Sequence, residues 1–240
     1  MLLDKVNKIA GFFIDALFPE KPYCILCGSR LKRGERLICS GCLGKMEPLS
    51  PPLCLKCGRP LERENSICED CRGKNRHFVE ARAFGAYRGV LKDIIHLYKY
   101  RGESGLCELI GEKMCETLKN QNWPPFDYLI PVPLHPERER ERGFNQSLLL
   151  AEEISQRTGV HVFRGLIRTR PTEHQSLLEK GLREANVAGA FAVKHGPAIN
   201  GKTLLLIDDV YTTGSTADEC SKALLSAGAA GVYVLCAARG

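Results

Sequence analysis

Four Cys-x-x-Cys pairs in the first third of the chain constrain its fold more than any other feature. They belong to a unit of about 30 residues that occurs twice. The sequence CILCG at residues 24–28 recurs as CLKCG at residues 54–58, and each unit closes with a second pair, ICSGC at 38–42 and ICEDC at 67–71. Because the whole unit repeats, the pattern is a stronger signal of a folded module than any single pair.

The chemistry of the pairs predicts two tetrahedral zinc sites. Two residues between cysteines allow a tight turn that directs both sulfurs at one ion, and the glycine after each first pair accommodates a positive φ. Four thiolates leave no open coordination position, so the predicted metal is structural. The predicted ligand sets are Cys24, Cys27, Cys39 and Cys42 for one ion, and Cys54, Cys57, Cys68 and Cys71 for the other. A crossed arrangement, in which the first and third pairs share an ion, is the alternative.

Other uses of paired cysteines fit this sequence less well. Structural disulfides are rare in reducing compartments, and a thioredoxin-like redox motif needs a strand-to-helix context that these glycine- and proline-flanked pairs lack. Four further cysteines fall in helical or strand patterns and are expected to be core residues. These are Cys107, Cys115, Cys220 and Cys236.

The charge of the chain does not by itself predict a nucleic-acid-binding protein. The formal net charge is +6, and 14 Lys/Arg against 9 Asp/Glu lie in residues 1–76. Two zinc ions held by eight thiolates would remove most of that local excess. No apolar run approaches the roughly 18 residues of a membrane span. Asp15 interrupts the only candidate core of a secretory signal and no cleavage site follows, so we expect a cytoplasmic protein. Residues 1–18 have apolar positions near helical spacing; we expect an amphipathic helix that packs on its own protein, or alternatively binds a membrane surface or a partner.

From residue 77 onward, predicted strands alternate with predicted helices. This order favours an α/β fold, in which a parallel sheet has helices on both faces. The run LLLI at residues 204–207 is apolar without alternation, as expected for a strand that is buried on both faces. The predicted strands are residues 78–87, 128–134, 161–167, 189–193, 203–207 and 231–237, and the predicted helices are 90–100, 108–118, 145–157 and 216–227.

The strand, loop and helix at residues 204–216 carry the chemistry. Asp208 and Asp209 come at the carboxyl end of the predicted strand, where ligands bind to parallel sheets. The loop Thr212, Thr213, Gly214, Ser215, Thr216 then enters a helix, whose free N–H groups suit a phosphate. Carboxylates beside it accept hydrogen bonds from ribose hydroxyls or position the water shell of a divalent ion. Together these groups predict a ribose 5-phosphate site, and no GxxxxGK[ST] loop indicates a nucleoside triphosphatase.

This thirteen-residue run resembles the phosphoribosyl pyrophosphate (PRPP) motif of type I phosphoribosyltransferases. Combined with the cysteine pairs, it is similar to the ComF family of competence-associated proteins. Three further stretches carry the likeness: LYKYRG at 97–102, PVPLHP at 131–136 with RGFNQ at 142–146, and residues 170–191. We therefore expect three parts: an N-terminal amphipathic helix over 1–19, a double zinc ribbon over 20–76 and, as the resemblance implies, a type I phosphoribosyltransferase-like domain over 77–240.

The resemblance also implies roles for individual residues. Asp208, Asp209 and Lys99 would act in catalysis, with Mg²⁺ accompanying PRPP. The 5-phosphate would bind to the loop from Thr212 to Thr216, and the pyrophosphate loop would contain Pro133, Leu134 and His135. Three arginines after that loop alternate with glutamates and would either add cations to the site or form a solvated helix. They are Arg138, Arg140 and Arg142.

The sequence and the resemblance are compatible with three functions. The first is a PRPP-binding protein that handles incoming single-stranded DNA or competence proteins during natural transformation, a role that comes from the resemblance alone. The second is a phosphoribosyltransferase for a base or an amine, and the third is a PRPP-responsive regulator. A basic cluster in the first cysteine unit is the candidate DNA surface, with an ordinary solvated hairpin as the alternative. It comprises Arg30, Lys32, Arg33 and Arg36. A homodimer is a further expectation, because dimers are common in this class.

Overall fold

The computed structural model describes residues 23–64, 66–100, 105–170 and 187–240. The chain divides into two compact units, Met1–Met46 and Glu47–Gly240. The first cysteine unit belongs to the smaller part, whereas the second packs within the larger part. The expected boundary at residue 76 therefore lies inside the larger unit. The helix expected over residues 1–19 lies outside the described residues.

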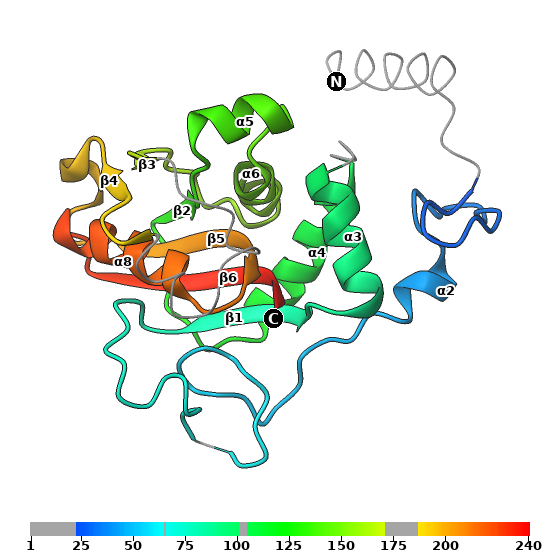
Figure 1. The fold of residues 1–240 in the computed structure, drawn as a ribbon, viewed down its shortest axis with the longest axis horizontal. Coiled ribbons are helices and arrows are strands. Elements are labelled where there is room, and N and C mark those ends of the chain that lie inside the picture. Colours follow the sequence, from blue (N-terminus) through cyan, green and yellow to red (C-terminus); the bar gives the residue numbers. More distant parts are fainter. Residues whose placement is uncertain (1–22, 65, 101–104, 171–186) are drawn as a thin grey trace. The chain divides into compact units, whose positions relative to one another are not determined.

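The larger unit is built on a four-stranded parallel sheet (Figure 1). Its strands are β1 (Ala81–Ala86), β2 (Tyr128–Pro131), β5 (Thr203–Tyr211) and β6 (Gly231–Arg239). They lie in the order β1-β6-β5-β2, and each neighbouring pair is parallel. A parallel bridge between Leu129 and Val162 extends the sheet beyond β2. This confirms the expected parallel sheet.

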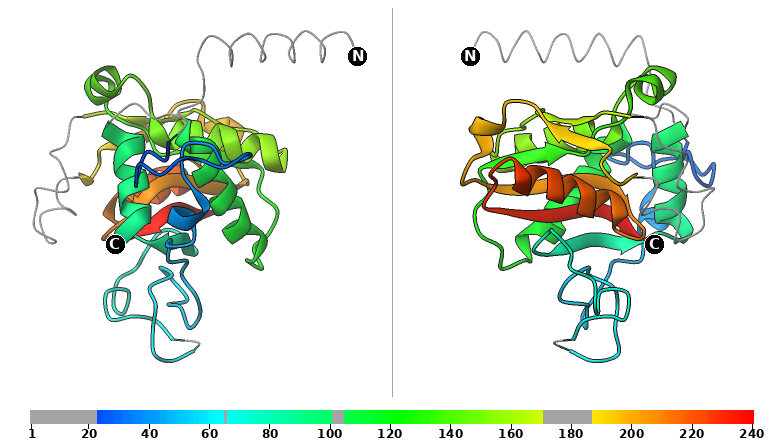
Figure 2. Two further views of the ribbon diagram at one scale, coloured as in Figure 1. Left: turned by 90° about the vertical axis from the view of Figure 1, so that its right-hand side faces the viewer. Right: turned by 60° about the vertical axis from the view of Figure 1, so that its left-hand side comes forward.

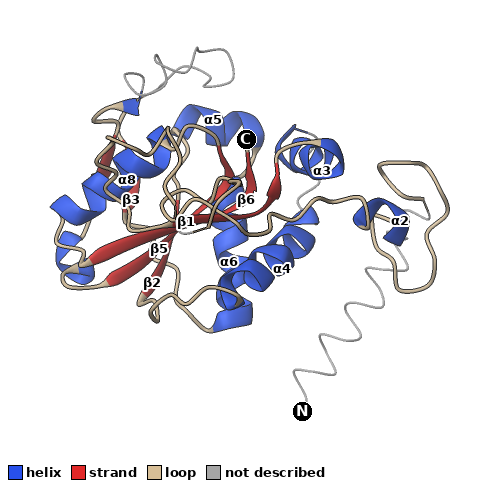
Figure 3. Cartoon of the chain, turned by 90° about the horizontal axis from the view of Figure 1, so that it is seen from below, coloured by secondary structure: helices blue, strands red, loops and turns tan. Residues whose placement is uncertain are grey.

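Helices cover both faces of this sheet. Crossovers between parallel strands are right-handed, so their direction along the sheet decides the face that each helix covers. The chain moves toward the β2 edge through α3 (Gly89–Tyr100), α4 (Leu106–Lys119) and α6 (Gln146–Thr158), and back toward β1 through α8 (Ser215–Ser226). Figure 3 accordingly shows α8 on one side of the strands, and α4 with α6 on the other. The four residues of the LLLI run, between these layers, are completely buried.

Shorter elements complete the unit (Figure 2). The helix α5 (Pro136–Arg142) follows β2, and a 3₁₀ turn covers Gly196–Ile199. The strands β3 (Leu166–Arg168) and β4 (Phe191–Val193) form a separate antiparallel pair. In the smaller unit, α2 (Ser40–Leu43) is a single helical turn.

Two strand predictions were wrong in detail. The strand expected over residues 161–167 is divided into the bridge at Val162 and the strand β3 of another sheet. Gly165 lies at the division, where a Cβ would come within 2.6 Å of the Lys194 carbonyl oxygen, so the backbone segments approach closely there. The strand expected to end at Ile207 continues to Tyr211. Asp208 and Asp209 are therefore part of β5, and Asp208 pairs in register with Cys236 of β6.

Among the residues that the structure describes, no helix combines the length and the apolar character needed to cross a bilayer.

Candidate functional site

The two cysteine units fold into the same turn. The amide of Cys24 donates to the carbonyl of Ser29 and that of Cys54 to the carbonyl of Arg59, both at 2.7 Å. In each unit the glycine after the first pair has a positive φ, 71° at Gly28 and 67° at Gly58, as the spacing predicts. The sequence repeat is therefore a structural repeat.

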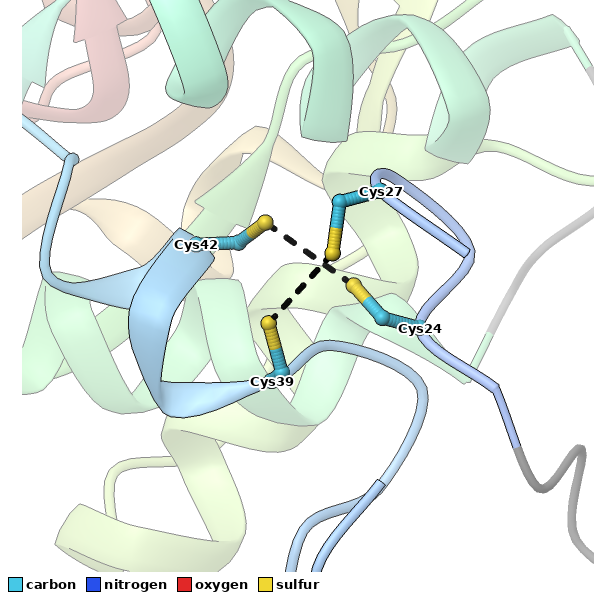
Figure 4. Close-up of side chains that lie close together, drawn as sticks. All are labelled: Cys24, Cys27, Cys39 and Cys42. Atoms are coloured by element: carbon cyan, nitrogen blue, oxygen red, sulfur yellow. Dashed lines mark hydrogen bonds between the residues drawn. The ribbon is translucent and has the colours of Figure 1, made fainter. Parts of the chain in front are cut away.

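Each unit gathers its four sulfurs at one point. Cys24, Cys27, Cys39 and Cys42 form the first four-cysteine site (Figure 4), and Cys54, Cys57, Cys68 and Cys71 form the second; within each, the sulfurs lie within 4.8 Å of one another. The Sγ–Sγ distance is 3.6 Å for Cys27–Cys39 and also for Cys57–Cys68. A tetrahedron with Zn–S bonds of about 2.3 Å has edges of about 3.8 Å. Both sites fit structural zinc, and the ligands are grouped without crossing.

A cavity of about 400 Å³ opens at the carboxyl ends of β2 and β5 in the larger unit. It is lined by the end of β5, by the loop before α8, by the turn after β2, and by side chains of α3 and α5. Its lining residues include Tyr87, Lys99, Tyr100, Pro133, Leu134, Arg138, Arg142, Arg168, Asp208, Asp209, Thr212, Gly214 and Thr216. The cavity thus brings together the three regions that the sequence singled out.

Two adjacent carboxylates form the floor of the cavity, and both are held by specific partners. Lys99, from the last turn of α3, makes an ion pair with Asp209 at an Nζ–Oδ2 distance of 2.6 Å. The Ser147 hydroxyl donates to Asp208 Oδ1 at 3.0 Å, as does the Asp209 amide at 2.9 Å. Sequence reasoning placed Lys99 near a diphosphate; here its ammonium contacts an aspartate beside the same cavity.

Burial controls the charges at this point. Desolvation raises the pKa of Asp208 to about 6, although Lys99 and the Ser147 hydroxyl both oppose the rise. Desolvation also lowers the pKa of Lys99 to about 8, against the attraction of Asp208. The two groups therefore titrate close to neutral pH, which is typical of functional sites.

The segment of residues 212–216, for which phosphate binding is proposed below and which is hereafter called the phosphate loop, runs from the end of β5 into the first turn of α8. The first N–H groups of a helix have no partner within the helix and attract anions. Gly214 precedes the helix with a φ of 81°, and a Cβ there would lie 2.1 Å from the Tyr211 hydroxyl. Glycine is therefore required both by the backbone conformation and by the packed tyrosine.

The RGFNQ stretch supports the site from α6. Gly143 ends α5 with a φ of 84°. Asn145 caps α6 by accepting from the Ser147 amide at 2.9 Å, and its Nδ2 donates to the Val132 carbonyl at 3.2 Å. The cap thereby holds the turn after β2 against the helix that carries Ser147.

Among the described residues, three arginines line the cavity together with Lys99. Arg138 and Arg142 are four residues apart in α5 and share one face of it, whereas Arg140 lies on another face, where its Nε donates to the Pro136 carbonyl. The Arg142 guanidinium lies 5.4 Å from the centre of the Tyr100 ring. Arg168, at the end of β3, was missed by sequence reasoning because only the fold brings β3 to this cavity.

Some expected site residues lie elsewhere. Thr213 and Ser215 are not among the described residues that line the cavity; their hydroxyls bond to each other at 2.8 Å and shape the loop from within. His135 is also absent from that lining, and its Nδ1 lies 3.4 Å from Glu137. Of the segment 170–191 that resembles the family, residues 171–186 lie outside the described part of the chain, as do Arg101 and Gly102.

Comparisons with known proteins agree with this picture. Residues 13–72 match the family model described as "Double zinc ribbon domain". The chain is 31% identical to "Competence protein ComFC" of Bacillus subtilis (strain 168), over 88% of this chain and 92% of that protein. It is 32% identical to "DNA utilization protein YhgH" of Escherichia coli (strain K12), over 90% of this chain and 96% of that protein.

A solved structure of glutamine PRPP amidotransferase from B. subtilis overlays on 54% of this chain and 25% of its own. The TM-score is 0.36 and the identity 20%. This likeness is too weak to bear on the function.

We expect the purified chain to carry two zinc ions, because each four-cysteine site provides a complete set of ligands. A Cys24→Ser/Cys27→Ser variant should retain one ion, and a Cys107→Ser control should retain two. Atomic emission of the gel-filtered protein measures the ratio of metal to chain. A double variant that still holds two ions would contradict the ligand grouping.

We expect Asp208→Asn to stabilise the chain at neutral and alkaline pH. The pKa of Asp208 is 3.8 ordinarily and about 6 in the fold, so ionisation opposes folding as pH rises through that interval. The gain should reach roughly 2–3 kcal/mol at pH 8 and shrink as pH falls below about 6. Urea unfolding at several pH values measures it.

Asp127→Asn is the matched control. Hydrogen bonds from the Thr203 amide and Lys202 lower the pKa of Asp127, so its replacement should destabilise the chain above the ordinary pKa. An Asp208→Asn variant less stable than the parent at pH 8 would contradict the assigned burial effect.

Proposed function

The chain belongs to the ComF family, and we propose that it binds PRPP with Mg²⁺ in the cavity at the end of β5 and serves in DNA uptake. One observation carries the PRPP assignment: Asp208 and Asp209 line the same cavity as Thr212, Gly214 and Thr216 of the phosphate loop. A phosphate group and a pair of ribose hydroxyls are the ligand parts that such an arrangement matches.

The charge of the lining supports a polyanionic ligand. Lys99, Arg138, Arg142 and Arg168 supply four cationic side chains, against the carboxylates of Asp208 and Asp209. Cationic side chains and helix N-terminal amides are the groups that stabilise phosphates in proteins. In the proposed complex the 5-phosphate binds to the phosphate loop, the ribose hydroxyls donate to the aspartates, and the diphosphate contacts the cationic side chains.

The donor set also fits Mg²⁺. This ion prefers oxygen ligands and is commonly held by one or two carboxylates together with substrate phosphates. Asp208 and Asp209 are the carboxylates that line the cavity and would hold it, directly or through water. When bound, Mg²⁺ would neutralise charge on the diphosphate.

Transfer of the phosphoribosyl group to a base or an amine is the second candidate function. Tyr87 and Tyr100 also line the cavity, and Tyr100 is 56% exposed. Exposed aromatic rings beside a sugar-phosphate site suit the stacking of a planar acceptor. A regulator that responds to PRPP without turnover would use the same binding site.

We expect the zinc-loaded chain to bind PRPP in the presence of Mg²⁺, and Asp208→Asn/Asp209→Asn to lose that binding by about tenfold or more. The aspartates would each lose a hydrogen bond to a ribose hydroxyl, which is worth about 1 kcal/mol or more. Isothermal titration calorimetry measures the affinity, with Asp127→Asn as a control that should bind like the parent. Equal affinities for the parent and the double variant would contradict the assignment.

The role in DNA uptake rests on the relatives and on the first cysteine unit. Two relatives are named for competence and for DNA utilization. Arg30, Lys32 and Arg33 are exposed in the smaller unit, where Glu35 accepts from the backbone amides of Lys32 and Ser40. These bonds hold the pKa of Glu35 at about 2, so its carboxylate stays ionised and helps to hold the hairpin that presents the cations.

We expect single-stranded DNA to bind with an affinity that falls steeply between low and physiological salt. Arg30→Gln/Lys32→Gln/Arg33→Gln should weaken binding and reduce the slope of log K against log salt by about 0.7 for each lost phosphate contact. Fluorescence anisotropy with a labelled oligonucleotide measures both. A matched triple variant at Lys92, Lys119 and Lys222, which are exposed in the larger unit, should behave like the parent. An equal loss of DNA affinity in both triple variants would contradict the assignment of Arg30, Lys32 and Arg33 as the DNA-binding surface.

A further inference from the structure

We propose that the second four-cysteine site and the phosphate loop are thermodynamically coupled through two buried arginines, Arg239 and Arg76, so that zinc at Cys57 and its partners strengthens PRPP binding. The proposal rests on the proposed function and adds a regulator to that site. All the residues involved belong to the larger unit of the chain. Neither arginine lines the cavity, so both are positioning residues.

Arg239 connects a metal ligand to the end of β5. Its Nε donates to the Cys57 carbonyl at 3.1 Å and its Nη2 to the Cys57 Sγ at 3.3 Å. The same guanidinium lies 5.4 Å from the centre of the Tyr211 ring, and the Arg239 side chain is buried. Groups that donate to a ligating sulfur fix the position of that ligand, and here the donor also packs on the residue before the phosphate loop.

Tyr211 transmits this contact to the phosphate loop. The tyrosine is buried, and its hydroxyl occupies the space that a side chain at position 214 would need. Phe78 packs edge-on against the same ring at 6.2 Å, and the Lys56 ammonium lies 5.4 Å from the centre of the Phe78 ring. Lys56 is inside the pair Cys54–Cys57, so two sets of contacts run from this cysteine turn to Tyr211.

Arg76 forms a separate link from the other pair of the second site. It follows Cys71 by five residues, and its Nη2 donates to the Thr213 carbonyl at 2.8 Å. The next residue, His77, donates its amide to Asp218 Oδ1 at 2.7 Å, in the first turn of α8. The segment after Cys71 therefore holds both the phosphate loop and the start of the helix behind it.

These contacts predict coupling because the second four-cysteine site and the phosphate loop are both held by the segments that carry Arg239 and Arg76. Zinc holds the two cysteine turns together, and the turns position Arg239 and Arg76 against the loop. A loop that is already held in its binding conformation loses less entropy when a phosphate binds. Coupling between two sites is reciprocal, so PRPP must raise the zinc affinity of the second site by the factor by which zinc raises PRPP affinity.

The test is a competition titration of zinc with a chromogenic chelator, performed on the full chain with and without PRPP and Mg²⁺. A Cys24→Ser/Cys27→Ser variant removes the first site, so that the signal comes from the second. We expect PRPP to raise the zinc affinity at least about fivefold, within the usual range of coupling between sites. The Asp208→Asn/Asp209→Asn variant, which is expected not to bind PRPP, is the control. Any change that PRPP causes in its zinc titration comes from binding of zinc by PRPP in solution.

Arg239→Lys and Arg76→Gln test the route of the coupling. Lysine keeps the charge but lacks the planar fork that contacts Cys57 and Tyr211 together. We expect both variants to bind zinc and PRPP with a smaller coupling factor. Arg82→Gln is the matched control. Arg82 donates to the carbonyls of Cys54 and Leu55 and pairs with Glu80. Its replacement removes hydrogen bonds to the same cysteine turn but keeps the contacts of Arg239 and Arg76, so the coupling should be unchanged.

The outcomes separate this inference from the proposed function. If PRPP binds but the zinc affinity is the same with and without it, the coupling is refuted and the PRPP site stands. Hydrogen exchange at the amides of residues 212–218, with zinc present or removed, tests the link without PRPP. If PRPP does not bind, faster exchange after zinc removal would support the mechanical link while the proposed function fails, and unchanged exchange would refute the link.

Discussion

Two adjacent carboxylates inside a buried parallel strand are the constraint on which the rest of the larger unit depends. β5 is covered by helices on both faces, so Asp208 and Asp209 lie in a region that desolvates carboxylates, and this burial raises the pKa of Asp208. Each needs a partner, and the fold supplies Lys99 from α3 and Ser147 from α6. The remaining space above them is lined by arginines, which favour an anionic ligand. Asp208, whose ionisation lowers stability at neutral pH, is thus also one of the two carboxylates that best account for a ligand site.

The second four-cysteine site is connected by side-chain contacts to the loop that lines this cavity. In the proposed function the phosphate loop presents its amides to a phosphate, so the contacts that hold this loop in shape bear on binding. Here Tyr211 packs against Gly214, Arg76 donates to the Thr213 carbonyl, and Arg239 contacts both Tyr211 and Cys57. The second four-cysteine site is therefore part of the structure that supports the phosphate loop, and it is also a folded module.

The sequence predicted what depends on local pattern. The repeat of Cys24–Gly28 at Cys54–Gly58 indicated two four-cysteine sites and the positive φ of their glycines, because the spacing of each pair favours a tight turn; the structure then showed that the pairs are grouped without crossing. The apolar run before Asp208 identified a strand buried on both faces. The pattern could not show that the strand continues through the aspartates, because DDVY at residues 208–211 does not alternate polar and apolar residues. The alternating burial of these residues is visible only in the structure.

Contacts between distant segments could not be predicted in this way. Arg168 reaches the cavity from β3, and Arg239 joins Cys57 across 182 positions of the chain. Neither residue lies in a motif of its own, and only the topology of the sheet brings them to these places. In α5, the sequence left two interpretations of the alternating arginines. The structure divides them by helical face, with Arg138 and Arg142 toward the cavity.

The central claim is that the cavity holds a phosphorylated pentose with its 5-phosphate on the phosphate loop. A crystal structure of the zinc-loaded chain with PRPP and Mg²⁺ tests it most directly. We predict 5-phosphate oxygens at about 2.7–3.2 Å from backbone nitrogens of residues 212–216, with the ribose hydroxyls on Asp208 and Asp209. A sugar phosphate bound elsewhere on the chain, with the phosphate loop making no contact to it, would contradict the account.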